Sequence, residues 1–274
     1  MLYRPSIGDG RCCVTNGVLP LKYIVAAFCC LLVAVTNVQG ETATLKMRFV
    51  FDGVPPPVKQ INIVPALAPA GGPVLDERLI IDPVSKGIRN VVVYAHTDRG
   101  ETKLGPFARS DNRHRLAMSN DRFDPHVLLA QAGDTIELVN RGRVQHNPVL
   151  SFFANQPRDV QIPPGVSRLI PVPRPEPAPI PVDCNRHPWM HAYVFVLDHP
   201  FVACSDSEGS ISIAGLPANT RLTFRVFHEA GRINRVGILG EETEWPRSRF
   251  SVDLVEGVND LGDILVPATS LKPN

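Results

Sequence analysis

The chain has 274 residues and almost equal numbers of basic and acidic side chains, 28 and 27, with a formal net charge of +1. This length accommodates one large or two modest domains. The balanced charge gives no indication of nucleic acid or an anionic membrane surface as a partner. The 27 prolines and 20 glycines favour short elements joined by many turns.

The first 40 residues have the pattern of an export signal. Their three basic residues all precede an apolar run of 13 residues at 23–35. A membrane span needs about 20 such residues, so the run fits a signal peptide better. We predict cleavage after Gly40 and a periplasmic or secreted protein with no membrane span, and an uncleaved anchor is the alternative.

After residue 40 the sequence predicts an all-β protein. Short runs of β-branched and aromatic residues alternate with turn residues, and helical periodicity is almost absent. Strands at this spacing are typical of β-sandwiches and barrels. The predicted strands lie within residues 44–51, 90–96, 126–142 (two strands around Gly133 and Asp134, with Ile136 and Leu138 inward), 193–198, 210–215, 221–229 and 249–257.

Two stretches depart from this rhythm. Residues 109–124 are polar, and we expect a short helix or a loop there. Residues 162–182 contain eight prolines, each of which lacks an amide donor, so they should form an edge strand or polyproline II and not a central strand. After Asp198 the sequence has the pattern of a self-contained β unit with its own turns, which predicts a domain boundary near residues 198–200.

Soft metal-binding side chains gather in one short segment. Cys184, His187 and Met190 are spaced C-x-x-H-x-x-M, which lets one tight loop turn all three toward a single point. Thiolate, imidazole and thioether together suit copper. A second histidine must come from elsewhere, and His146 follows a predicted strand and turn. A disulfide between Cys184 and Cys204, or a zinc site, are the alternatives.

The stretches GDTIELVN…VQHN and CNRHPWM together resemble the cupredoxins, which are small blue-copper electron carriers. The C-x-x-H-x-x-M loop is most similar to that of amicyanin, and the resemblance covers roughly residues 115–198. It implies a Greek-key β-sandwich that holds one type 1 copper ion through His146, Cys184, His187 and Met190.

The same resemblance gives roles to two neighbouring residues. Asn147 would tie the His146 loop to the cysteine loop through hydrogen bonds. Trp189 would cover the metal loop, or form an apolar rim where electrons leave. The four ligands leave no position for a substrate, so the resemblance implies single-electron transfer between redox partner proteins, and not an enzyme.

His126, His191, His199 and His228 have no assigned role. Isolated histidines are usually structural, and we expect that here. The alternative is a second metal site in which His199 and His228 approach each other or His191. No Ser-His-Asp order or pair of carboxylates supports hydrolytic catalysis.

Residues 198–229 resemble the carboxypeptidase regulatory-like domain, a transthyretin-like sandwich. The shared features are a turn from Asp206 to Gly209 and the alternating apolar residues of two following strands. Such modules act as spacers or interaction surfaces. We therefore predict a signal peptide at 1–40, a cupredoxin-like domain with an N-terminal extension at 41–198, and this second sandwich at 199–274.

The function predicted from the sequence is that of an exported blue-copper electron carrier. Two other classes remain open. One is a non-redox envelope protein that uses two β-sandwiches for binding or structure, and the other is a copper enzyme with an additional histidine site.

Overall fold

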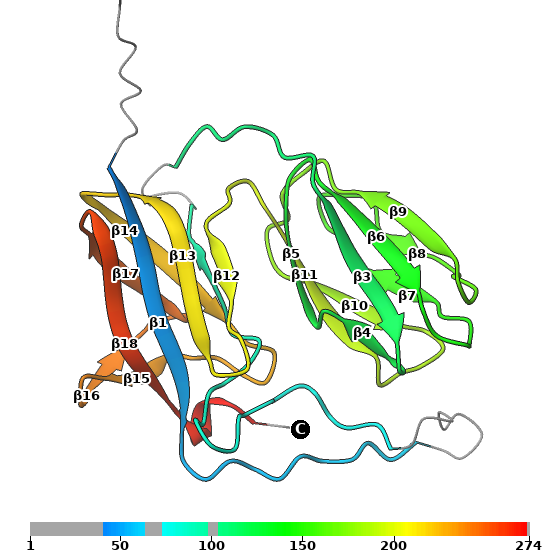
Figure 1. The fold of residues 1–274 in the computed structure, drawn as a ribbon, viewed down its shortest axis with the longest axis horizontal. Helices are drawn as coiled ribbons and strands as arrows, with labels where there is room; N and C mark the ends of the chain where they lie inside the picture. The colour runs from blue at the N-terminus through cyan, green and yellow to red at the C-terminus, as the bar shows by residue number, and fades with distance from the viewer. Residues whose placement is uncertain (1–40, 64–72, 98–103, 273–274) are drawn as a thin grey trace, which may run out of the picture. The chain divides into compact units, whose positions relative to one another are not determined.

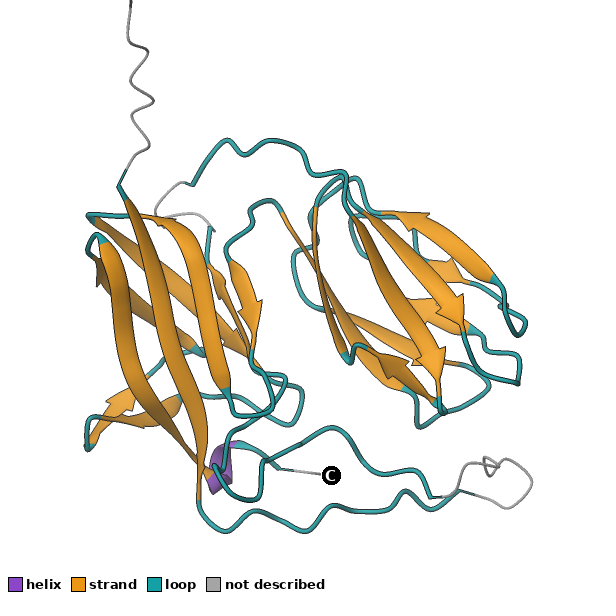
Figure 2. Ribbon diagram, in the orientation of Figure 1, coloured by secondary structure: helices purple, strands orange, loops and turns teal. Residues whose placement is uncertain are grey.

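The computed structural model describes residues 41–63, 73–97 and 104–272. The predicted signal peptide, residues 1–40, lies outside these ranges. All regular structure in the described ranges is β except one short 3-10 helix, η2 (Ala268–Ser270), which confirms the all-β prediction (Figure 1 and Figure 2). In the same ranges, no helix has the length and apolar character needed to cross a bilayer.

An unbroken stretch of chain forms one β-sandwich, which we call the contiguous sandwich (Figure 1). Its strands are β3 (Arg113–Ser119), β4 (Arg122–Asp124), β5 (Val127–Gln131), β6 (Thr135–Asn140), β7 (Pro148–Leu150), β8 (Arg158–Asp159), β9 (Ser167–Pro171), β10 (Ile180–Cys184) and β11 (His191–Leu197). One sheet has the order β4-β3-β6-β9 and the other β5-β11-β10-β7-β8. Each sheet contains one parallel pair, β3 with β6 and β5 with β11.

The remaining strands form a second sandwich, which we call the discontinuous sandwich. They are β1 (Thr42–Asp52), β2 (Val92–Ala95), β12 (Val202–Cys204), β13 (Ser210–Pro217), β14 (Thr220–Phe227), β15 (Arg235–Ile238), β16 (Glu241–Glu244), β17 (Arg249–Leu254) and β18 (Gly257–Pro267). The sheet orders are β13-β1-β18-β15-β16 and β12-β2-β14-β17.

The predicted placement of the N-terminal strands in the cupredoxin-like domain is wrong. Strand β1 lies between β13 and β18, and β2 lies between β12 and β14. The alternating Leu45, Met47 and Phe49 of β1 are buried in the same core as the strands after residue 200. Alternation in a sequence reveals a strand and its buried face, but it does not identify the sheet that the strand joins.

Each sandwich has its own apolar core. In the contiguous sandwich, Ile136 and Leu138 of β6 point inward as predicted, and both are fully buried. The core of the discontinuous sandwich is built around Phe49, Phe224 and Trp245. The two cores are separate clusters of buried side chains.

The polar stretch 109–124 forms a β-hairpin and not the predicted helix or loop. Strands β3 and β4 pair on either side of Asn120 and Asp121, whose φ angles are +50° and +56°. Two central residues with positive φ are the signature of a tight hairpin turn, and Asn and Asp tolerate it. The polar composition arises because Arg113 and Arg115 of β3 pair with Glu137 on the neighbouring strand.

The prediction for the proline-rich stretch is confirmed for β9 and wrong for β10. Strand β9 is an edge strand, as predicted, but β10 lies in the middle of its sheet although it contains Pro181. The carbonyl of Pro181 accepts a bond from the Ser151 N–H, so its nitrogen faces the β7 side. The paired register with β7 ends at Leu150, opposite Val182, so Pro181 lies where the ladder with β7 terminates.

The features that resemble the regulatory-like domain have their expected local structure. Gly209 closes a turn on Asp206 with φ of +84°, and its N–H donates to the Asp206 carbonyl at 3.2 Å. The predicted inward residues are buried: Ile211, Ile213, Leu216, Leu222, Phe224 and Val226. Membership of that domain family stays a prediction.

Candidate metal centre

Three of the predicted ligands meet at one end of the contiguous sandwich. One donor atom each from His146, Cys184 and His187 lies within 4.8 Å of the others. The His146 and His187 Nδ1 atoms are 3.0 Å apart, and the Cys184 Sγ lies 4.0 Å and 3.6 Å from them. Residues 38 positions apart in sequence thus direct a sulfur and two nitrogens to one point.

Strand pairing explains this convergence. Cys184 is the last residue of β10 and sits opposite Pro148, the first residue of β7. His146 precedes β7 by two positions, so the antiparallel register brings it beside the cysteine. The His187 N–H then donates to the Cys184 carbonyl at 3.2 Å, which turns the chain back over the site.

A buried asparagine that the sequence interpretation missed shapes the His146 loop. The Asn140 side chain donates to the carbonyls of Val144 and Ile162, at 2.7 Å and 2.8 Å, and accepts from the Gly142 N–H at 2.9 Å. His146 itself exchanges two backbone hydrogen bonds with Ile162. The available signal was a polar residue ending an apolar strand directly before a turn.

Asn147 links the two loops through its backbone. Its N–H donates to the Cys184 Sγ at 3.5 Å, and its carbonyl accepts from the Asn185 N–H at 3.1 Å. The side-chain Oδ1 of Asn147 is buried and has no hydrogen-bond partner in the described ranges. An N–H aimed at sulfur stabilises a thiolate, because it places a positive dipole end beside the developing charge.

Burial keeps the two imidazoles neutral at neutral pH. Desolvation is the main cause that lowers the pKa of His146 to about 4, and the nearby His187 and Arg186 contribute to the same shift. Desolvation also lowers the pKa of His187, against the opposing effect of the Asp121 carboxylate. Neutral imidazole is the form that binds metal, so both rings are in the protonation state of a metal ligand.

Met190 and Trp189 complete the loop. Met190 is 1% exposed and packs in the same core cluster as Cys184, and its N–H donates to the His187 carbonyl at 2.9 Å. The Trp189 and His187 rings pack in a T-shaped arrangement at 5.3 Å between centroids, and the Trp189 Nε1 donates to the Asp121 carbonyl at 3.2 Å. The indole therefore connects the metal loop to the β3–β4 turn.

The donor set fits a type 1 copper site. One sulfur and two imidazole nitrogens converge, and a buried thioether follows in the same loop. Within the described ranges, no fourth His, Cys, Asp or Glu joins the group, although a closed zinc site requires four such donors. Cys184 and Cys204 are both free, so the alternative disulfide is not formed.

The four histidines without an assigned role have structural contacts. His199 donates to the Ala95 carbonyl and accepts from the Phe201 N–H. His228 donates to the Arg89 carbonyl and accepts from the Ala230 N–H. His126 contacts the Glu229 carboxylate, and His191 pairs with Asp183 at 2.7 Å. In the part of the chain that the structure describes, these residues form no second cluster of metal donors.

No family model matches this chain, and no curated protein does. Among solved structures, a copper-containing nitrite reductase from Thermus scotoductus is similar over 35% of this chain and 25% of its own length, with 21% identity and a TM-score of 0.29. The chain thus spans about a quarter of that enzyme.

Two small copper proteins are also similar to this chain. A purple cupredoxin from Nitrosopumilus maritimus aligns over 30% of this chain and 98% of its own, with 16% identity and a TM-score of 0.26. The amicyanin from Paracoccus versutus aligns over 31% and 80%, with 17% identity and a TM-score of 0.28. The similarity covers about a third of the chain.

Proposed function

We propose that the protein is an exported type 1 copper protein that transfers single electrons between redox partner proteins. The observation that carries this proposal is the convergence of two neutral imidazoles and the Cys184 sulfur beside the buried Met190. A copper ion bound there would supply a one-electron Cu(I)/Cu(II) couple.

The surrounding residues fit electron transfer better than catalysis. Four protein donors would fill the coordination sphere and leave no open position for a substrate. His146 is buried, whereas His187 is partly exposed and therefore offers the shorter route between the site and the surface. The hydrogen-bonded loops on both sides hold the donors in place, which keeps structural change small when the charge at the site changes.

Copper titration of the purified protein tests the proposal. Addition of Cu(II) should give an intense visible band from charge transfer between the Cys184 thiolate and copper, at one equivalent of metal. Replacing Cys184 by Ser should abolish the band, because oxygen does not provide that transition.

Cys204→Ser is the matched control. Burial raises the pKa of Cys204 to about 12, so this thiol stays protonated and is a poor ligand. The band should be unchanged in this variant. A colourless wild-type protein, or colour that survives Cys184→Ser, would remove the basis for the copper assignment.

We further propose that the protein works in the periplasm or outside the cell and that the discontinuous sandwich is a regulatory-like spacer or interaction module. The export pattern of the first 40 residues supports the first point, and the Asp206–Gly209 turn with its following strands supports the second. Sequencing the N-terminus of the protein recovered from its cell of origin tests cleavage after Gly40.

A further inference from the structure

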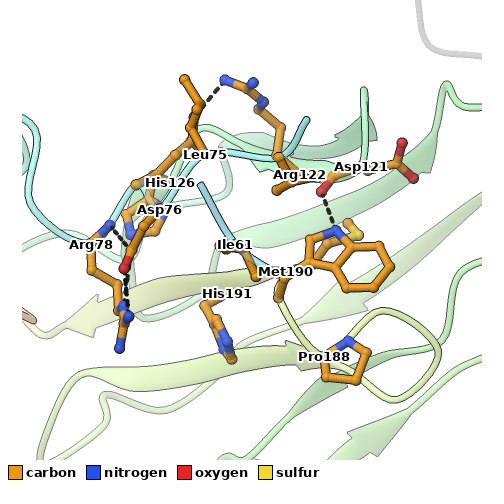
Figure 3. A pocket seen from close by; sticks show the side chains of 13 residues that line it. Ile61, Leu75, Asp76, Arg78, Asp121, Arg122, His126, Pro188, Met190 and His191 are labelled. Atoms are coloured by element: carbon orange, nitrogen blue, oxygen red, sulfur yellow. Dashed lines mark hydrogen bonds and ion pairs between the residues drawn. The ribbon is translucent and has the colours of Figure 1, made fainter. Parts of the chain in front are cut away.

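The charged residues near the metal loop are of two kinds, those in ion pairs and those without one. On the Trp189 side, a paired extension approaches from residues 59–61 and 74–78, which we call the arm; it is held together by bonds such as Ile61 N–H to the Val74 carbonyl. The arm and the loop line a cavity of about 230 Å³ (Figure 3). Its charges are compensated, since Asp76 pairs with Arg78 and Glu77 with Arg122.

The two loops that carry the imidazoles contain three exposed arginines: Arg141, Arg143 and Arg186. None of them forms an ion pair with any residue in the described ranges, whereas Arg113, Arg115 and Arg122 of the same sandwich each pair with a carboxylate. The chain as a whole is almost neutral, so this concentration of positive charge is local.

These arginines lie close to the metal ligands. Arg186 falls between Cys184 and His187, and its charge lowers the pKa of both site histidines. Arg141 and Arg143 flank Gly142, where an added Cβ would lie 3.4 Å from the His146 Nε2. Both ligand loops therefore contain arginines next to the histidine ligands, and the 141–143 segment approaches the His146 ring.

Apolar surface lies among the arginines. Val144 is 48% exposed, and Pro163, Pro164 and Pro188 are exposed on neighbouring loops. His187 is partly exposed in the same region. The carboxylates near it are Asp121, on the Trp189 side, and Asp159, which lies by Asn185. Apolar residues with arginine at their rim are the composition of a protein interface.

We propose that this surface, Arg141, Arg143, Val144, Arg186 and Pro188, docks the acidic face of a partner protein that exchanges electrons through His187. The proposal rests on the proposed function. The arginines are spread over two loops around apolar residues, which suits an extended protein surface better than a single small anion. The near-neutral charge of the whole chain argues against nucleic acid.

Binding to two haem proteins of opposite surface charge tests the proposal. Cytochrome b5, which has an acidic face, and cytochrome c, which has a basic face, are titrated by calorimetry into the full chain at low and high salt. We expect measurable affinity for cytochrome b5 that falls with salt, and weaker binding of cytochrome c. The triple variant Arg141→Gln, Arg143→Gln, Arg186→Gln should lose roughly tenfold in affinity for cytochrome b5.

The control is a triple variant with the same net charge, Arg109→Gln, Arg174→Gln, Arg247→Gln, at exposed arginines outside this surface. It should bind cytochrome b5 like the wild type. Equal loss in both triple variants, preference for cytochrome c, or arginine-dependent binding of a single-stranded oligonucleotide but not of cytochrome b5 would overturn the proposal.

Running the titration with metal-free and copper-loaded protein separates the two proposals. Arginine-dependent binding by a protein that forms no copper band would keep the docking surface and reject the copper site. A copper band together with arginine-independent binding would keep the copper site and reject the docking surface. In the loaded protein, stopped-flow reduction by cytochrome b5 should slow roughly tenfold in the first triple variant and stay unchanged in the control.

Discussion

The two sandwiches differ in how the chain builds them. The contiguous sandwich is complete within residues 113–197, whereas the discontinuous sandwich needs β1 and β2 from before that stretch and all strands after it. Strands β2 and β12, which precede and follow the contiguous sandwich in the chain, are antiparallel neighbours. The whole contiguous sandwich therefore occupies the position of a long hairpin loop.

This arrangement has a low cost because the entropy of closing a loop grows only slowly with its length. The junction is held by His199, whose Nε2 donates to the Ala95 carbonyl while its Nδ1 accepts from the Phe201 N–H. The buried histidine therefore fixes the two chain segments at the point of insertion, and the metal-bearing sandwich can fold on its own core.

The largest expected effect comes from removing β1. A chain that begins after Gly53 loses a strand paired on both edges, together with Leu45, Phe49 and Phe51 of the core. The discontinuous sandwich should not fold, while the contiguous sandwich should still bind copper. Limited proteolysis and the copper band check this, with a chain beginning at Glu41 as the control; loss of the band together with β1 would show that the sandwiches fold as one unit.

Two core substitutions should each destabilise one sandwich. Phe49→Ala and Leu138→Ala remove fully buried side chains from separate cores, and such changes cost about 3–5 and 2–5 kcal/mol. Calorimetry should show two unfolding transitions. Phe49→Ala should lower the midpoint temperature of one, and Leu138→Ala that of the other. Copper should raise only the midpoint that Leu138→Ala lowers. If both variants lower both transitions equally, the cores are coupled.

Acid should destabilise the discontinuous sandwich through His228. Burial lowers its folded-state pKa to about 4, below the ordinary value of 6.5, so the unfolded chain binds the proton first. Stability should fall as pH drops from about 6.5 to about 4, by on the order of 3 kcal/mol, and this contribution should not change further below that.

Unfolding measured across this pH range checks the expectation. His228→Gln should flatten the slope for the discontinuous sandwich, whereas His191→Gln, at an exposed site on the contiguous sandwich, should leave it unchanged. An unaltered slope in His228→Gln would assign the acid sensitivity to other groups.

The smallest effect is expected at the arm. Glu77→Gln removes the ion pair with Arg122, whose side chain is half exposed, and such pairs contribute less than about 1 kcal/mol. Neither unfolding transition should move by more than this amount. A larger drop for the contiguous sandwich would mean that the arm supports the metal loop through the Asp121 turn and Trp189.

Features that depend on local patterns could be predicted from the amino-acid sequence. Alternation located β1, β6, β13 and β14 and their buried faces, because side chains of a strand alternate with period two. The C-x-x-H-x-x-M spacing identified Cys184, His187 and Met190, because the donors of one tight loop are neighbours in sequence. The candidate fourth donor, His146, came from its place after a strand and from the resemblance to cupredoxins.

Features that depend on pairing between distant segments became visible in the three-dimensional fold. The assignment of β1 to the discontinuous sandwich, the central place of β10 despite Pro181, and the meeting of His146 with Cys184 all follow from strand register. The same holds for the difference between paired and unpaired arginines around the metal loop, because it depends on whether a carboxylate lies near each guanidinium group. Local sequence fixes which residues face a core or a loop, whereas long-range contacts choose their partners.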